Sequence, residues 1–477
     1  MEYDLIIIGA GPSCLGLAQC CCKINKKILI IDRESSIGGC HRVRRVNKLF
    51  TEHGPRVYSE TYKTFQTLLK DMNVNFYDLF TTYNFNLTEI GGQTVFSTLS
   101  YIELSKFAFS FFILTFNKNH GTDILLYDYL INNKFNKKSI DMIDRVCRLT
   151  DGGGSDKFTL NEFLQLFNQQ FFYKLYQPKL PNDVSLFKIW KNYLDKKNVD
   201  FIFDVKSLKL NVNENGNNIN SILINNETYY SKNVVIATPP LNLNRIMVES
   251  NLSHNWGDLS KFANDTKYIE YISITFHWDK ILNLKKVYGF PISYWGIAFI
   301  KLSDYSNFNE INSQTVISAA ITISDVVSPR IGKTANQCTE SELLMEVFEQ
   351  LKESYGDILK PTISILSPGV KYSKEESRWI SIDTAFITSS VQKFLPFQNK
   401  LIPNLYNLGT HNGKSLYKFT SLESAVSNGV YLSKVIYPEL KFSNESIAIS
   451  KSYTLTDILN IIILLITLYI LYKVLII

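Results

Sequence analysis

The sequence lacks the cysteine and histidine spacings that build disulfide frameworks and zinc sites. Its seven cysteines are odd in number, and three of them are consecutive, Cys20 to Cys22. No C-x-x-C pair occurs, and the six histidines show no ligand spacing with the cysteines. These absences argue against a secreted, disulfide-rich fold and predict no structural metal, so we expect a protein of a reducing compartment.

The chain also has only a small excess of charge of one sign. The 50 basic and 44 acidic residues give a net charge of +6, and the only local basic cluster is His41 to Arg45. This cluster is too short for a nucleic-acid footprint, so we expect no nucleic-acid partner. With 45% hydrophobic residues, the chain can bury apolar cores, which argues against a disordered chain. Its length of 477 residues predicts two or three domains.

Long apolar runs are missing until the last twenty residues. The N-terminal run, Leu5 to Ile8, is short, so we expect no signal peptide. Ile458 to Ile477 contains one charge, Lys473, and at ~1.5 Å per residue a helix there spans about 30 Å, the thickness of a bilayer core. A buried C-terminal helix is the alternative, but it would show a polar stripe. We predict a transmembrane tail anchor over 455–477 after a linker over 441–454, with the body of the chain on the cytosolic side.

The N-terminal segment has the pattern of a dinucleotide-binding turn. Leu5 to Ile8 leads into Gly9-Ala10-Gly11-Pro12-Ser13, and a helical stretch then precedes a second apolar run that ends at Asp32. Gly9 permits a tight turn, Gly11 lets the backbone approach a pyrophosphate at the helix N-terminus, and Asp32 can accept hydrogen bonds from a ribose. We therefore predict a Rossmann-like unit, in which Cys20 to Cys22 pack against the sheet.

Two further elements follow Asp32. The first is Ile37-Gly38-Gly39-Cys40, and the second is Glu52-His53-Gly54-Pro55-Arg56. In these elements the chain resembles the FAD-dependent superfamily of amine oxidases, protoporphyrinogen oxidases and phytoene desaturases. The resemblance implies FAD as the cofactor, with the paired glycines against its phosphates and the second element beside the flavin. The family's arginine after the paired glycines is replaced by Cys40, with Arg42 two positions later.

Later segments match that family in the same order. Residues 199–237 read as a β-meander with a hairpin turn at Asn215-Gly216, and Val205 matches a valine whose backbone meets the adenine. Residues 402–410 and 420–429 resemble a closing strand, glycine turn and helix whose N-terminus, capped by Thr420 or Ser421, would stabilise the reduced flavin anion. The implied cofactor-binding residues are Gly9, Gly11, Pro12, Ser13, Asp32, Arg33, Gly38, Gly39, Gly54, Pro55, Arg56, Val205, Gly409, Thr410, Ser421 and Leu422.

The resemblance implies a FAD-dependent oxidoreductase that passes hydride from a C–H or C–N bond of a small molecule to the flavin, with an unidentified electron acceptor. A hydrophobic substrate is one option. The candidate catalytic residues are His53, Arg56 and His411. Tyr271 stands where many amine-oxidising members have a lysine, which argues against amine oxidation specifically. His277, on the expected strand 271–278, is interpreted as structural.

Two other functions stay open. A flavin enzyme similar to UDP-galactopyranose mutase would share the glycine turn and a segment like His53-Gly54-Pro55, but that family's C-terminal signature is not matched. A catalytically silent, membrane-bound FAD protein would explain the departures from the family's pattern. These departures are Cys14, Cys40, Tyr271 and Thr410.

The order of the motifs predicts an α/β fold in which two domains interleave. We expect a Rossmann-like FAD-binding domain assembled from 1–60, 185–245 and 396–440, and an α+β substrate domain from 61–184 and 246–395. The aromatic run Phe107 to Phe116 is too short to span a bilayer. We favour a core helix of the substrate domain there, and a substrate tunnel or a membrane-dipping face are the alternatives.

Overall fold

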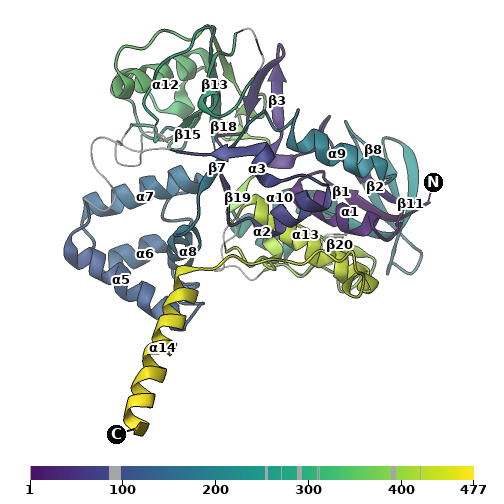
Figure 1. The fold of residues 1–477 in the computed structure, drawn as a ribbon. Coiled ribbons are helices and arrows are strands. Elements are labelled where there is room, and N and C mark those ends of the chain that lie inside the picture. The colour runs from purple at the N-terminus through teal and green to yellow at the C-terminus, as the bar shows by residue number, and fades with distance from the viewer. Residues whose placement is uncertain are drawn as a thin grey trace.

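The computed structural model describes residues 2–84, 98–252, 256–269, 271–286, 293–308, 310, 312–387, 394–418 and 420–476. Figure 1 shows three regions: a large sheet covered by helices near the N-terminus, a second sheet with its own helix, and a group of helices at one side. The C-terminal helix projects from the base of that group, away from the rest of the molecule (Figure 1).

The largest sheet has seven strands and joins distant parts of the chain. Its parallel part runs β8-β2-β1-β11, and β20 pairs with the far edge of β11. The N-terminal half of β11 instead continues an antiparallel meander with β10 and β9. The strands are β1 (Glu2–Ile8), β2 (Ile28–Ile31), β8 (Asp200–Ile202), β9 (Leu208–Val212), β10 (Ile219–Ile224), β11 (Glu227–Ile236) and β20 (Leu405–Asn407).

Both faces of the parallel strands are buried, which is why they read as unbroken apolar runs. On β1, Leu5 and Ile7 lie in one apolar core with helices α1 (Pro12–Cys22) and α13 (Leu422–Ile436). Ile6 and Ile8 lie in a second core with the meander and α10 (Pro240–Glu249). The predicted α/β, Rossmann-like fold is therefore confirmed, whereas the division into two interleaved domains stays a prediction.

The first part of the predicted meander, residues 199–210, contains two strands with different partners. β8 pairs with β2, and β9 begins the meander. Between them Asp204 takes a left-handed backbone conformation, with φ of 56°, and Val205 donates its backbone N–H to the Asp32 carbonyl at 3.1 Å. The predicted turn at Asn215-Gly216 is present, with Gly216 at φ of 68°.

The second sheet is antiparallel, in the order β14-β15-β13-β16, and packs against helix α12 (Glu340–Tyr355). Its central strand β13 is buried on both faces, because β4 (Leu49–Glu52) covers the side away from α12. His277 bonds through Nε2 with the Phe50 carbonyl and through Nδ1 with Ser313, each at 2.9 Å, so it is the structural residue that we expected. The strands are β13 (Ile272–Trp278), β14 (Ala298–Lys301), β15 (Thr315–Ile321) and β16 (Ile363–Leu366).

The third region consists of helices around a small apolar core. These helices are α5 (Tyr101–Phe116), α6 (Leu126–Asn132), α7 (Lys137–Asp151) and α8 (Leu160–Gln170). Helix α14 (Leu455–Ile476) lies beside these helices. Its part Leu455–Val474 is long and apolar enough to cross a membrane, and 6% of that part is buried. The preferred interpretation of Phe107 to Phe116 as a core helix is wrong for one face, because Phe109, Phe112 and Phe116 are exposed.

Short elements connect these regions. The helices are α2 (Lys63–Asp71), α3 (Phe76–Leu79), α9 (Leu186–Lys196) and α11 (Leu259–Asp265). The strands are β3 (Val43–Val46), β5 (Tyr58–Ser59), β6 (Phe80–Thr82), β7 (Leu175–Pro178), β12 (Lys267–Tyr268), β17 (Val370–Ser373), β18 (Arg378–Ser381) and β19 (Phe386–Ile387). The hairpin β3–β4 and the segment after β18 bring the second sheet close to the ends of β1 and β2.

Candidate cofactor and active site

A cavity of about 540 Å³ opens at the carboxyl ends of β1 and β2, where ligands bind in open α/β sheets. Segments from three distant parts of the chain line it. The first, near the N-terminus, includes Gly9 to Ser13, Asp32 and Gly39; the second includes Val205 and Thr238; the third includes Gly409 to His411 and Ser421. Its size is in the range of small-molecule and cofactor sites, about 300 to 1,000 Å³.

Glycines let three pieces of backbone meet at this cavity. Gly9 has φ of 107°, and a Cβ there would lie 2.5 Å from the Ala237 carbonyl oxygen. A Cβ on Gly39 would lie 3.0 Å from the Cα of Gly11. Because Gly11 precedes α1 and has no side chain, the first amides of that helix are left uncapped beside the cavity. Uncapped amides and the helix dipole together favour an anion such as a phosphate.

Asp32 is held in place at the end of β2. Its Oδ2 accepts the Ala10 backbone N–H at 2.7 Å, its Oδ1 accepts that of Glu34 at 2.9 Å, and Arg42 Nη2 lies 3.5 Å away. Arg42 is itself anchored by the Ser36 carbonyl, 2.6 Å from Nη2. The carboxylate is thus oriented at the cavity wall with lone pairs left for a ligand hydroxyl.

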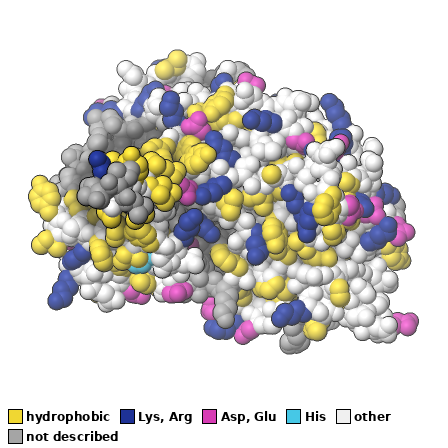
Figure 2. Space-filling view, turned by 60° about the horizontal axis from the view of Figure 1, so that its bottom comes forward, with side chains coloured by type: hydrophobic (Ala, Val, Ile, Leu, Met, Phe, Trp, Pro, Cys, Tyr) yellow, Lys and Arg dark blue, Asp and Glu magenta, His cyan; other side chains and the backbone are white. Residues whose placement is uncertain are grey.

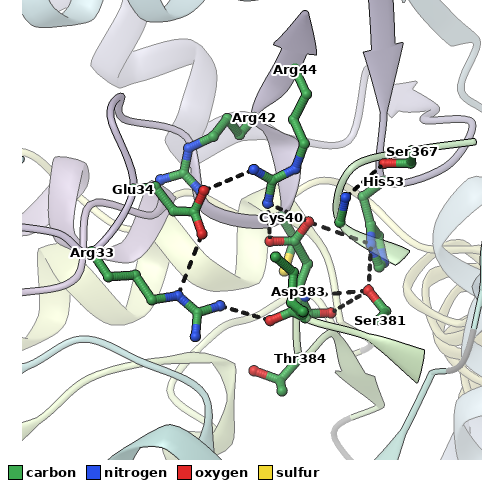
Figure 3. Close-up of polar contacts among 12 residues, drawn as sticks. Arg33, Glu34, Cys40, Arg42, Arg44, His53, Ser367, Ser381, Asp383 and Thr384 are labelled. Atoms are coloured by element: carbon green, nitrogen blue, oxygen red, sulfur yellow. Dashed lines mark hydrogen bonds and ion pairs between the residues drawn. The ribbon is translucent and has the colours of Figure 1, made fainter. Parts of the chain in front are cut away.

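A network of ion pairs closes this side of the cavity (Figure 3). Arg44 donates to Glu34 at 2.8 Å and to both oxygens of Asp383 at 2.8 and 3.0 Å. Arg33 reaches across to the Ile382 carbonyl at 2.7 Å. Burial opposes the ionisation of Glu34, yet the bond from Arg44 lowers the pKa of that carboxyl overall. The segment after β18 is therefore tied to the segment after β2.

His53 lies beside this network rather than in the cavity wall (Figure 3). Its Nδ1 is 3.3 Å from Ser381 Oγ and 3.8 Å from Asp383 Oδ2, and its ring centroid is 5.7 Å from that of Tyr271. Burial, together with the charges of Arg56 and Arg44, holds the pKa of His53 well below its usual value. His53 is therefore neutral at physiological pH.

Buried polar atoms gather around Arg56. Arg56 lines the cavity and donates to the Cys40 carbonyl at 2.6 Å, and its own carbonyl accepts from Gln177 at 2.6 Å. Burial raises the pKa of Glu52 to about 7, although a hydrogen bond with Ser318 and the charge of Arg56 act in the opposite direction. Among the described residues four buried atoms here have no hydrogen-bond partner: Glu52 Oε1, Arg56 Nε, Gln177 Oε1 and Asn182 Oδ1. Unpaired buried polar atoms are costly, so their concentration indicates a place for a polar ligand or water.

His411 presents a proton acceptor at the opposite wall. Asn407 Nδ2 donates to two carbonyls, so its Oδ1 is the acceptor for His411 Nε2 at 2.9 Å and for Asn412 at 2.7 Å. His411 Nε2 must then carry the proton, which leaves Nδ1 as an acceptor without a partner among the described residues. Burial lowers the pKa of His411 to about 3, so the ring stays neutral.

Helix α13 begins at the same wall. Ser421 is its N-cap and accepts the Ser424 backbone N–H at 3.0 Å, as the sequence predicted for Thr420 or Ser421. Thr420, Ser421 and Ala425 line the cavity, so the positive end of this helix faces it.

Most of the predicted site residues meet at this one cavity. Those that line it are Gly9, Gly11, Pro12, Ser13, Asp32, Arg33, Gly39, Arg56, Val205, Gly409, Thr410, His411 and Ser421. The predicted site residues that are described but do not line the cavity are Gly38, His53, Gly54, Pro55 and Leu422. Gly54 packs against Tyr271, since a Cβ there would lie 3.3 Å from the tyrosine ring, so Tyr271 occupies space behind the glycine segment.

The sequence did not single out several residues that shape the site. Glu34, Arg44 and Asp383 form its ion-pair network, and Gln177 and Asn182 contribute to the buried polar group around Arg56. The basic cluster His41 to Arg45 was the available signal: two of its arginines hold acidic side chains of the site.

Comparisons with known proteins agree with this architecture. Residues 7–72 match the family model of an NAD(P)-binding Rossmann-like domain. A putrescine oxidase variant with a redesigned cofactor site superposes with a TM-score of 0.64 at 12% identity, covering 92% of this chain and 99% of that one. Cyclohexylamine oxidase from Brevibacterium oxydans gives 0.58 at 12% identity, with 92% and 100% covered. A candidate protoporphyrinogen oxidase from Exiguobacterium gives 0.60 at 14% identity, with 91% and 98% covered. No curated protein sequence matches the chain significantly.

Proposed function

We propose that this chain, which has the fold of the FAD-dependent amine oxidases and protoporphyrinogen oxidases, is a FAD-dependent oxidoreductase attached to a membrane. One observation carries the proposal: three segments that are far apart in sequence converge on a single cavity at the carboxyl ends of β1 and β2. The convergence supports a dinucleotide site because each segment supplies a different part of the recognition.

The donor set fits FAD. The uncapped start of α1, with Gly11 and Gly39, would hold the diphosphate, and Asp32 would accept from the adenosine ribose. Val205 lines the cavity with its N–H already bonded to Asp32, so its carbonyl is the group left for the adenine. The start of α13 would stabilise negative charge on the flavin, and His411 Nδ1 could accept a hydrogen bond there.

Bound FAD supplies the electron sink for hydride removal from a C–H or C–N bond. The chain's own residues bind and orient the reactants. His53 and His411 are neutral, so they can exchange hydrogen bonds but are poor general acids. Tyr271 and Cys40 depart from the family's pattern, as a catalytically silent FAD protein would. The test therefore also measures whether a substrate reduces the flavin.

The first experiment measures FAD bound by the full chain purified in detergent. We expect flavin absorbance and free FAD after denaturation. Asp32→Ala should weaken FAD binding at least about tenfold, because it removes charged hydrogen bonds worth about 1.5 to 3 kcal/mol. Asp195→Asn is a matched control, since this carboxylate pairs with Lys191 on the surface of α9.

The outcomes separate the alternatives. Protein that takes up no FAD would overturn the proposal. Protein that binds FAD, but whose flavin is never reduced by candidate amines or isoprenoids under anaerobic conditions, would be the silent form. Protection of the reduced flavin by UDP-galactose would instead indicate the mutase-like function.

We also propose that α14 is a single-pass membrane anchor, with the rest of the chain on the cytosolic side. The helix has 22 residues and, at ~1.5 Å per residue, is about 33 Å long, enough to cross a bilayer core. Its single basic residue near the end, Lys473, can reach the far headgroups. If α14 is an anchor, the full chain should stay bound to lipid vesicles during an alkaline carbonate wash and should then float with them.

A further inference from the structure

Helix α5 turns an aromatic face outward. Tyr101 is 92% exposed and Phe109 is 64% exposed, and Ile102, Phe112 and Phe116 are also exposed. With the exposed Ser105 and Ala108, these positions recur every three or four residues and so form one face of the helix. Isolated exposed apolar residues are normal on soluble proteins, but a continuous stripe of large ones marks an interaction surface.

The inner face of the same helix packs Phe107, Phe111 and Leu114 in an apolar core, and it also carries polar side chains. Glu103 is buried and accepts the backbone N–H groups of Ser100 and Asn136 at 2.8 and 2.7 Å. Ser110 is buried against the Tyr129 hydroxyl at 2.9 Å. A helix with one face toward water carries polar side chains on that face, whereas the outer face of α5 is apolar apart from Ser105. This outer face therefore indicates apolar surroundings.

The neighbour of α5 is the proposed anchor. Asn460 of α14 donates to the Thr115 carbonyl of α5 at 3.1 Å, and the backbone N–H of Thr456 donates to Asn168 of α8 at 2.9 Å. Figure 1 shows α5 running across the upper end of α14 rather than along it. If α14 crosses a bilayer, α5 therefore lies in the plane of its surface.

Further apolar side chains continue this surface. Phe167, Phe171 and Phe172, at the end of α8, are exposed near the start of α14. Figure 2 shows hydrophobic side chains gathered around the base of the projecting helix, with lysines and arginines at the edge of the patch. Lys118, two residues after α5, has a side chain 67% exposed, and Lys451 precedes α14. Both pair with Asp457, so the three groups together carry one positive charge. Basic groups at the edge of an apolar face match the headgroups of an anionic bilayer.

We propose that the outer face of α5 is a membrane-docking surface, inserted in the plane of the bilayer beside α14. This inference rests on the proposed anchor and extends it, because α5 would add a second contact with the bilayer beside α14. With α5 docked, the body is held in one orientation, and a second apolar contact adds to membrane affinity.

The test places a fluorophore on α5 in the full chain. Phe109→Cys provides an exposed thiol, whereas six native cysteines are buried and the seventh, Cys40, has a pKa raised by burial to about 11. The protein is labelled with a polarity-sensitive dye and reconstituted into phosphatidylcholine–phosphatidylserine vesicles that contain acyl-chain nitroxides. Phe442→Cys is the control, because Phe442 is 88% exposed and follows the 3-10 helix Pro438–Lys441, which contacts α13.

We expect nitroxide quenching at position 109 to be at least about threefold stronger than at position 442, since an interfacial helix buries its apolar face about 5 to 10 Å deep. Vesicle flotation of the same samples tests α14 independently. Floating protein with equal quenching at both positions would overturn the docking surface and leave the anchor intact. Self-quenching between labels at position 109 without lipid quenching would also overturn it, in favour of contact with a second copy.

Discussion

Helices α1 and α5 are both rich in apolar residues, yet they direct them oppositely. Every residue of α1, from Pro12 to Cys22, is buried against the large sheet and α13. Helix α5 buries Glu103 and Ser110 beside Leu114, and it exposes the rings of Phe109, Phe112 and Phe116. Apolar content thus indicates that a helix avoids water, while its neighbours decide whether protein or, as we propose for α5, lipid supplies the apolar surroundings.

The two helices also differ in how closely they pack. Helix α1 meets α13 backbone to backbone: a Cβ on Gly16 would lie 3.1 Å from the Val426 carbonyl oxygen, and one on Gly429 would lie 2.3 Å from that of Ser13. Small residues make this approach possible. The contact fixes the glycine turn above the cavity, because Ser13 both lines the cavity and touches α13.

The largest expected effect comes from opening that contact. Gly429→Ala places a methyl group on backbone atoms that cannot move aside, so we expect a loss of at least about 3 kcal/mol in the free energy of unfolding and a loss of bound FAD. Gly216→Ala is the control: no atom lies within 4 Å of a Cβ there, and its φ of +68° costs only about 1 kcal/mol. Equal losses in chemical denaturation would show that α1 and α13 are not closely packed.

The sequence predicted the α1 side of the molecule well, because its signals are local. The glycine turn, the apolar runs of β1 and β2 and the hairpin at Gly216 each depend on a few adjacent residues. Prediction from the sequence failed where the structure of a segment depends on contacts with another segment. Residues 199–210 form two strands, because the backbone N–H of Val205 donates to the Asp32 carbonyl between them. Helix α5 buries Glu103, because Ser100, Asn136 and Ser139 donate hydrogen bonds to its carboxylate, and the opposite face of α5 is then left outside.

A smaller effect is expected inside α5, at Glu103. Burial opposes its ionisation, but hydrogen bonds from Ser100, Asn136 and Ser139 lower its pKa below 4.5 overall. Glu103→Gln should cost about 2 kcal/mol at pH 7, because it weakens bonds to a charged acceptor. A lowered pKa stabilises the folded state above the unfolded value, and this contribution disappears as the pH falls through the folded pKa. The gap to wild type should therefore narrow below pH 4.5.

Denaturation across this pH range checks the Glu103 prediction. Glu214→Gln, on the exposed hairpin turn, is the matched control and should change stability by less than about 0.5 kcal/mol. A gap that stays constant with pH would mean that the carboxylate charge contributes nothing.

The candidate site shows the same limit of prediction. Gly9, Gly11 and Asp32 belong to one continuous motif and were identified from their spacing. Arg44 and Asp383 are 339 residues apart, and nothing local to either predicts that they form an ion pair. His53 was placed next to the flavin by its position in a motif, but its side chain turns toward Ser381 and Asp383 (Figure 3).

The smallest effect is expected on the outer face of α5. Phe109→Ser should change the free energy of unfolding in detergent by less than about 0.5 kcal/mol, because the ring is 64% exposed and contributes little to the protein core. Leu114→Ser, on the same helix but 1% exposed, should cost about 3 kcal/mol or more, since it leaves a cavity and buries a hydroxyl. Chemical denaturation of both variants measures the difference. Equal losses would mean that Phe109 packs against protein, and α5 would then be a core helix like α1.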